Sequence, residues 1–145
     1  MSAYRQQALI DVPITTVWGL VSDPNRHPEW WPRVVKVQCE GIEQGCEYRQ
    51  VTATPMKQMD TTILIEDLDD LRTLNVRCLD TGTFCRWLLT ETQEGTFIDA
   101  EFGMDPNGLA DRVFDAVAGK RYFRRWLEGA LDGLRVAAGE ERAVS

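Results

Sequence analysis

The spacing of apolar and polar residues changes along the chain and divides it into three parts. In the first part, residues 4–12 alternate as in a strand, and residues 14–22 carry apolar side chains every three or four positions, as on one face of a helix. Asp23 and Pro24 then supply an N-cap and a first-turn proline for a second short helix, which two further prolines end. This part is therefore predicted to be one strand followed by two short helices.

In the second part, residues 34–104, short apolar runs alternate with turn residues, which is typical of an antiparallel meander. Five turns are expected, centred on Ile42-Glu43, Met56-Lys57, Asp69-Asp70, Thr81-Gly82 and Gln93-Glu94. Because side chains alternate between the two faces of a strand, these turns assign every residue to a face. The predicted inner face consists of Val35, Val37, Cys39, Cys46, Tyr48, Gln50, Thr52, Thr61, Ile63, Ile65, Leu74, Val76, Cys78, Cys85, Trp87, Leu89, Ile98, Ala100, Phe102 and Met104. The predicted outer face carries Arg49, Glu66, Arg77, Arg86, Asp99 and Glu101.

The third part, residues 107–138, is predicted to be one long amphipathic helix. Its apolar stripe consists of Leu109, Val113, Ala116, Val117, Phe123, Leu127, Leu131 and Leu134. The stripe needs a partner, and the inner face of the sheet is the only predicted surface large enough to cover it. Residues 139–145 are predicted to be a polar, frayed tail. The expected fold class is therefore α+β, with residues 1–138 forming a single domain.

Composition and charge narrow the classes of partner. The chain has 145 residues, the length of one domain, and a formal net charge of −7, which repels phosphate backbones and anionic headgroups. We therefore expect no nucleic-acid partner. The longest apolar runs fall short of the roughly 18 residues that span a bilayer, so no transmembrane segment is predicted. The first nine residues lack the segments of a signal peptide, which predicts a cytoplasmic location.

Short motifs in the first part point to a known family. They are Ile10-Asp11-Val12-Pro13, Val17-Trp18, Ser22-Asp23-Pro24 and Trp30-Trp31-Pro32. Together with the order of elements, they resemble the START-like (SRPBCC) superfamily, which includes polyketide cyclases and lipid-transfer domains. The resemblance implies a helix-grip fold: a curved seven-stranded antiparallel sheet, two short helices after the first strand, and a long C-terminal helix packed across the sheet. The catalytic residues of this superfamily differ between branches, so no catalytic motif is carried over.

A cavity between sheet and helix would be lined by the inward residues, most of which are apolar. The expected lining is Trp18, Trp30, Tyr48, Gln50, Thr52, Thr61, Ile63, Val76, Trp87, Ala100, Phe102, Val113, Val117 and Lys120. The polar members on two neighbouring strands, with Thr52 placed opposite Thr61, form either a hydrated patch at the strand ends or a ligand contact. Lys120 either points into the cavity beside Gly119 or extends its ammonium group to solvent.

The remaining reactive side chains support simpler interpretations. His27 is the only histidine, without a titratable partner, so a surface or capping role is expected. The predicted register places Cys39 opposite Cys46 and Cys78 opposite Cys85, where reduced, packed thiols are the preferred interpretation. The cysteine spacing is unsuited to zinc, so neither a metal nor a cofactor is expected.

Two functional hypotheses follow. In the first, the protein binds a small hydrophobic ligand such as a lipid, a polyketide or an isoprenoid. In the second, it is an enzyme of the polyketide cyclase/aromatase kind, in which Tyr48, Gln50 and Lys120 promote enolisation and dehydration in the same cavity. The small ligand is the expected partner, and a homodimer is left open.

Overall fold

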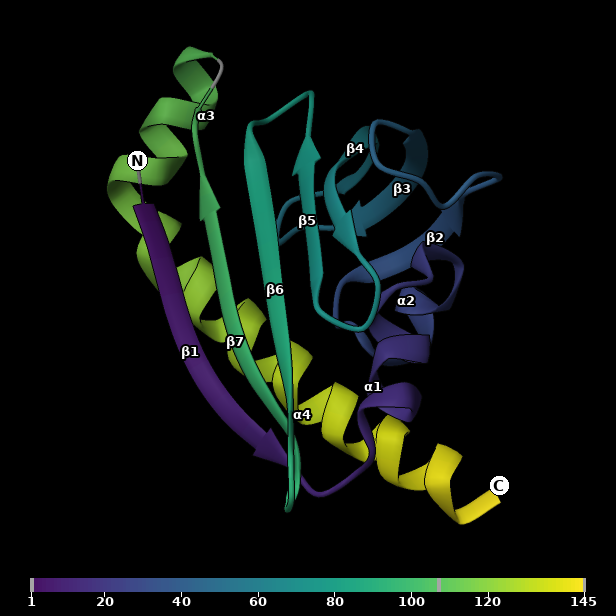
Figure 1. Cartoon of the computed structure of the whole chain (residues 1–145). Helices are drawn as coiled ribbons and strands as arrows, with labels where there is room; N and C mark the ends of the chain where they lie inside the picture. The colour runs from purple at the N-terminus through teal and green to yellow at the C-terminus, as the bar shows by residue number, and fades with distance from the viewer. Residues whose placement is uncertain (1, 107, 145) are drawn as a thin grey trace.

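The computed structural model describes residues 2–106 and 108–144 of the chain (Figure 1). In chain order the elements are β1 (Ser2–Ile10), α1 (Ile14–Val21), the 3-10 turn η1 (Pro24–Arg26), α2 (His27–Trp30), β2 (Val34–Gln38), β3 (Glu47–Ala53), β4 (Gln58–Asp69), β5 (Thr73–Cys78), β6 (Thr83–Thr92), β7 (Gly95–Met104), α3 (Leu109–Phe114), the π-helical segment η2 (Asp115–Gly119) and α4 (Lys120–Val144). The strands form one antiparallel sheet in the order β1-β7-β6-β5-β4-β3-β2. The predicted α+β helix-grip fold is confirmed.

The sheet curves around α4, and α1 and α2 close one end (Figure 1). The core lies between them because the inner faces of the strands and one face of α4 are both apolar. Its fully buried members include Trp87, Phe102, Phe123, Leu127 and Leu134. Burying a large apolar side chain contributes roughly 1.5–3 kcal/mol, so this layer holds the helix onto the sheet.

The strand register differs from the predicted one, although the assignment of faces is almost unchanged. Gln50 pairs with Thr61, whereas the sequence placed Thr52 there, and Val76 rather than Cys78 lies opposite Cys85. These shifts move the pairing by two residues, and the alternation of side chains has a period of two. The inner face is therefore retained, although the predicted pairing of Cys78 with Cys85 is wrong. Cys39 and Cys46 lie outside the paired residues of β2 and β3. All four cysteines are free thiols.

One inner-face prediction on β2 is wrong. A register shift between Val34 and Lys36 interrupts the pairing of β2 with β3. Such a bulge inserts an extra residue and reverses the alternation beyond it. As a result Val34 is buried, whereas Val35, which was expected to face inward, is 48% exposed.

The C-terminal helix begins on a different face from the predicted one. The π-helical segment η2 separates α3 from α4, and a π turn contains more residues than an α turn, so it rotates all that precedes it. Leu109, Val113 and Val117 are 80%, 54% and 81% exposed, and Lys120 is exposed as well. The predicted stripe is therefore correct from Phe123 onward and wrong before it. Asn107, the predicted first residue, lies outside the described residues.

The segment predicted to fray is helical. Helix α4 continues through Val144, six residues beyond the predicted end at Ala138, and Ser145 lies outside the described residues. Two contacts hold this segment: Glu141 pairs with Arg26 at 3.0 Å, and Arg142 donates to the backbone oxygen of Asp11 at 2.6 Å. Both partners belong to the first 30 residues, which a local sequence pattern does not reveal.

His27 is fully buried, so its predicted surface position is wrong. Its Nε2 lies 2.8 Å from the backbone oxygen of Val21 at the end of α1, which agrees with the alternative capping role. The ring packs against Trp30 and Trp31. Desolvation lowers the pKa of His27 to about 4, and the hydrogen bond to Val21 and the charge of Asp23 oppose this shift only in part.

Candidate functional site

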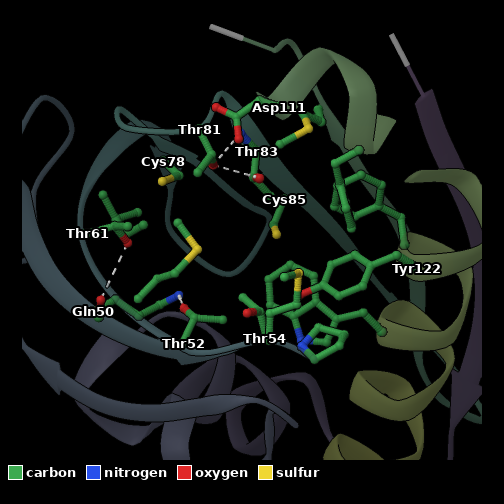
Figure 2. A pocket seen from close by; sticks show the side chains of 18 of the residues that line it. Gln50, Thr52, Thr54, Thr61, Cys78, Thr81, Thr83, Cys85, Asp111 and Tyr122 are labelled. Carbon is green, nitrogen blue, oxygen red and sulfur yellow. Dashed lines mark hydrogen bonds between the residues drawn. The ribbon is translucent and has the colours of Figure 1, made fainter. Parts of the chain in front are cut away.

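A cavity of about 540 Å³ lies between the inner face of the sheet and residues 110–126 (Figure 2). The strands contribute Gln50, Thr52, Met59, Thr61, Ile63, Val76, Cys78, Thr83, Cys85 and Met104. The helical segments contribute Ala110, Asp111, Phe114, Ala118, Tyr122, Phe123 and Trp126. Trp31 and the turn residues Thr54, Pro55, Met56, Lys57 and Thr81 complete the lining. Met56 is 94% exposed, so the turn between β3 and β4 lies at the mouth of the cavity.

The polar groups of the sheet wall are short, neutral side chains in pairs. Gln50 Nε2 donates to Thr52 Oγ1 at 2.9 Å, and Thr61 Oγ1 donates to the backbone oxygen of Gln50 at 3.4 Å. At the other end of the wall, the hydroxyls of Thr81 and Thr83 lie 2.9 Å apart. Figure 2 shows both groups facing the same space. The wall therefore offers hydrogen bonds without charge.

Aromatic rings form another part of the cavity wall. Trp31 stacks on Phe102 with ring centroids 5.3 Å apart and also contacts Trp126 at 5.7 Å. Trp126 is fixed by its Nε1, which donates to the backbone oxygen of Pro32 at 2.6 Å. Behind them lies Trp87, which is fully buried against Trp31 and Phe102. This cluster forms a rigid apolar surface against which a flat ligand can pack.

Burial favours the neutral forms of three titratable groups in and near the cavity. Burial raises the pKa of Tyr122, an effect that the nearby Arg33 guanidinium partly opposes. Burial also raises the pKa of the Cys85 thiol and of the Tyr48 phenol well above their ordinary values. A thiol reacts as its thiolate, so Cys85 is a poor nucleophile at neutral pH.

The predicted lining residues fall into three groups. Five line the cavity: Gln50, Thr52, Thr61, Ile63 and Val76. Six are buried but lie outside the lining: Trp18, Trp30, Tyr48, Trp87, Ala100 and Phe102. Three are exposed on the outer side of the helical segments, away from the cavity: Val113, Val117 and Lys120. Lys120 therefore takes the solvent-facing alternative.

Sequence reasoning missed the helical wall of the cavity. A signal for it was present, because Ala110, Phe114, Ala118, Tyr122 and Trp126 follow one another at intervals of four residues. A four-residue repeat lies on one face when a helix is slightly underwound, as it is through η2. Three lining residues of the predicted inner face were not chosen as lining: Cys78, Cys85 and Met104. Two others, Thr54 and Thr81, belong to turns, and the alternation of side chains along a strand does not assign turn residues to a face.

Neither a metal site nor a membrane-crossing helix is found in the part of the chain that the structure describes. No group of three or more histidine, cysteine, aspartate or glutamate side chains lies together there in a way that would hold an ion. None of its helices combines the length and the apolar character needed to cross a bilayer.

Solved structures of low sequence identity share this fold. A crystal structure of a Nitrosomonas europaea protein superposes with a TM-score of 0.76 at 15% identity, covering 98% of this chain and 97% of that one. The AHSA1-like protein from Aeromonas hydrophila gives a TM-score of 0.71 at 14% identity over 95% and 92% of the two chains. The di-domain ARO/CYC StfQ from the steffimycin biosynthetic pathway gives 0.69 at 21% identity, with 99% of this chain matching 52% of StfQ.

Sequence comparison supplies two further findings. Curated relatives, named bifunctional glutamine synthetase adenylyltransferase/adenylyl-removing enzyme in Burkholderia mallei and Burkholderia pseudomallei, are 27% identical over 93% of this chain. The chain spans only 15% of their length. The second finding is a family model, described as polyketide cyclase / dehydrase and lipid transport, that matches residues 1–139. The chain therefore belongs to the polyketide cyclase / dehydrase and lipid transport family.

Proposed function

We propose that the protein binds a small, largely apolar ligand in the cavity between the sheet and residues 110–126. The main support is the cavity itself: at about 540 Å³ it falls within the roughly 300–1,000 Å³ typical of small-molecule sites. Its lining combines an aromatic end with a few neutral polar groups, as such sites usually do. The polyketide and lipid chemistry of the family agrees with this ligand class.

The alternative function, a cyclase/aromatase-type enzyme, relied on Tyr48, Gln50 and Lys120. Lys120 is exposed on the far side of the helix, and Tyr48 does not contribute to the lining. Only Gln50 remains in the cavity, and an amide neither takes up nor releases a proton at neutral pH. We therefore favour binding over catalysis. The cytoplasmic location and the homodimer stay predictions from the sequence.

Titration with the neutral fluorescent probe N-phenyl-1-naphthylamine tests the proposal. We expect saturable binding of one probe per chain, with emission that rises as the probe enters the apolar space. Roughly 0.3 kcal/mol per non-hydrogen atom gives a dissociation constant on the order of 0.1 mM or tighter for a probe of this size. A linear, non-saturating response would contradict the proposal, as would a probe affinity that is unchanged when the cavity is filled by Ile63→Trp.

A further inference from the structure

Gln50 presents an unpaired amide oxygen to the cavity. Its side chain is 8% exposed, and its Nε2 is engaged with Thr52 Oγ1 at 2.9 Å (Figure 2). Its Oε1 accepts no hydrogen bond from any residue that the structure describes. This oxygen is not one of the fully enclosed polar atoms that lack a partner, so it is accessible from the cavity, where water or a ligand can donate a hydrogen bond to it.

The neighbouring hydroxyls do not supply that donor. Thr61 Oγ1 donates to the backbone oxygen of Gln50, not to its side chain. Thr54 Oγ1 donates to the backbone oxygen of Lys57 at 2.7 Å, and the Thr81 and Thr83 hydroxyls bond to one another. Among the described residues, none of these hydroxyls donates to Gln50 Oε1.

The charged residues of the lining are far from Gln50 or of the wrong sign for an anion. Within the described lining they are Lys57 and Asp111. Lys57 is exposed and lies in the turn next to the Ala53–Gln58 pair, three pairs along the hairpin from Gln50–Thr61, a separation of roughly 10 Å. Asp111 is itself acidic. The Arg33 guanidinium lies outside the lining, over the Tyr122 ring and bonded to the backbone oxygen of Ala53 at 3.4 Å. An ionised ligand group at Gln50 would therefore lose its hydration and gain no cation from the lining in return.

We propose that Gln50 is the polar anchor of the cavity and that its Oε1 accepts a hydrogen bond from a neutral O–H group, a phenol, enol or alcohol, of an otherwise apolar ligand. Carboxylates and phosphates are selected against. The specificity rests on the proposed function, because it assumes that ligands occupy this cavity. The proposed ligand class is hydroxylated apolar compounds, and fatty acids are excluded from it.

Three compounds of one shape test this anchor: 4-propylphenol, which donates a hydrogen bond, 4-propylanisole, which only accepts one, and 4-propylbenzoate, which is ionised at pH 7. Each is titrated against the complex with N-phenyl-1-naphthylamine, and its affinity follows from displacement of the probe. We expect the phenol to bind about three- to tenfold more tightly than the anisole, the worth of one hydrogen bond, and the benzoate to bind most weakly.

Gln50→Met keeps the length of the side chain and removes the acceptor, so the phenol and the anisole should then bind equally. Gln38→Met, an exposed glutamine on the neighbouring strand β2, is the matched control and should keep the preference. Equal binding of phenol and anisole to the unmodified protein, a preference that survives Gln50→Met, or benzoate binding as tight as phenol binding would overturn the inference. If Gln50→Met fails to fold, the affinities of the unmodified protein decide. Failure of the fluorescent probe itself to bind would instead contradict the proposed function.

Discussion

Two isoleucines on β4 offer a sharp test of whether the cavity is open. Ile63 and Ile65 lie two residues apart on the inner face and are 4% and 0% exposed, yet only Ile63 lines the cavity. Tryptophan fits a strand about as well as isoleucine does, so local propensity does not separate the two sites. At Ile65 the larger ring must displace packed neighbours, at a cost of about 1–3 kcal/mol. At Ile63 the ring can extend into empty space.

The expected difference is large enough to measure by urea unfolding. With a denaturant slope of about 2 kcal/mol/M, Ile65→Trp should lower the midpoint by about 0.5–1.5 M, whereas Ile63→Trp should leave it nearly unchanged. Binding should show the opposite order. Ile63→Trp should weaken N-phenyl-1-naphthylamine binding by about tenfold or more, equivalent to about 1.4 kcal/mol, and Ile65→Trp should have little effect at temperatures where it is folded.

Far-UV circular dichroism is the appropriate probe of unfolding, because the added tryptophan alters fluorescence. The reasoning would be refuted if both substitutions lowered the midpoint equally, since Ile63 would then be packed as tightly as Ile65. It would also be refuted if Ile63→Trp left probe binding intact.

Two other predictions concern stability. A methyl group at Gly133 on α4 would lie 2.0 Å from the backbone oxygen of Trp30, whereas at Gly139 on the same helix it would meet no atom within 4 Å. Gly133→Ala should therefore destabilise the protein by about 1–3 kcal/mol, and Gly139→Ala should stabilise it by about 0.5–1 kcal/mol, as measured by thermal unfolding. Equal effects would show that α2 does not approach α4 this closely. The pKa of His27 is about 4 when folded and about 6.5 when unfolded, so between these values the unfolded chain binds a proton that the folded chain does not. The free energy of unfolding should fall by up to roughly 3 kcal/mol as pH drops from 6.5 towards 4. His27→Gln should flatten this pH dependence between pH 6.5 and 5. An unchanged slope would mean that the histidine is not buried in its neutral form.

The sheet was predictable because its face pattern tolerates errors in pairing. The sequence placed Thr52 opposite Thr61, and the structure pairs Gln50 with Thr61, but a slip of two residues leaves all three on the inner face. The single-residue irregularity at Val34 was not predictable in this way, because one extra residue reverses the alternation and carries no local sequence signal. The polar half of the cavity was therefore within reach of sequence reasoning.

The helical half was missed because an α-helical period was assumed for a segment whose phase depends on tertiary contacts. An assumed α-helical period placed Val113, Val117 and Lys120 towards the sheet, but η2 inserts a π turn whose Asp115 accepts a hydrogen bond from the backbone of Ser2 at 3.0 Å. That contact joins residues more than 100 positions apart in the sequence. The α-helical period does not reveal this contact, although the four-residue repeat from Ala110 to Trp126 follows the face that results from it.

The cavity exists because large side chains fill only one part of the space between helix and sheet. Around Trp126 the aromatic rings meet across the interface, and the core there is solid. Towards the start of the helical segments the lining residues include Ala110 and Ala118, which are too short to reach the strands opposite. In a solid core an unpaired oxygen such as Gln50 Oε1 would be costly, whereas beside an open space water or a ligand can satisfy it. Short residues on the helix facing a polar residue on the strands therefore mark the wall of a cavity in this chain, and the contrast between Ile63 and Ile65 tests where that wall ends.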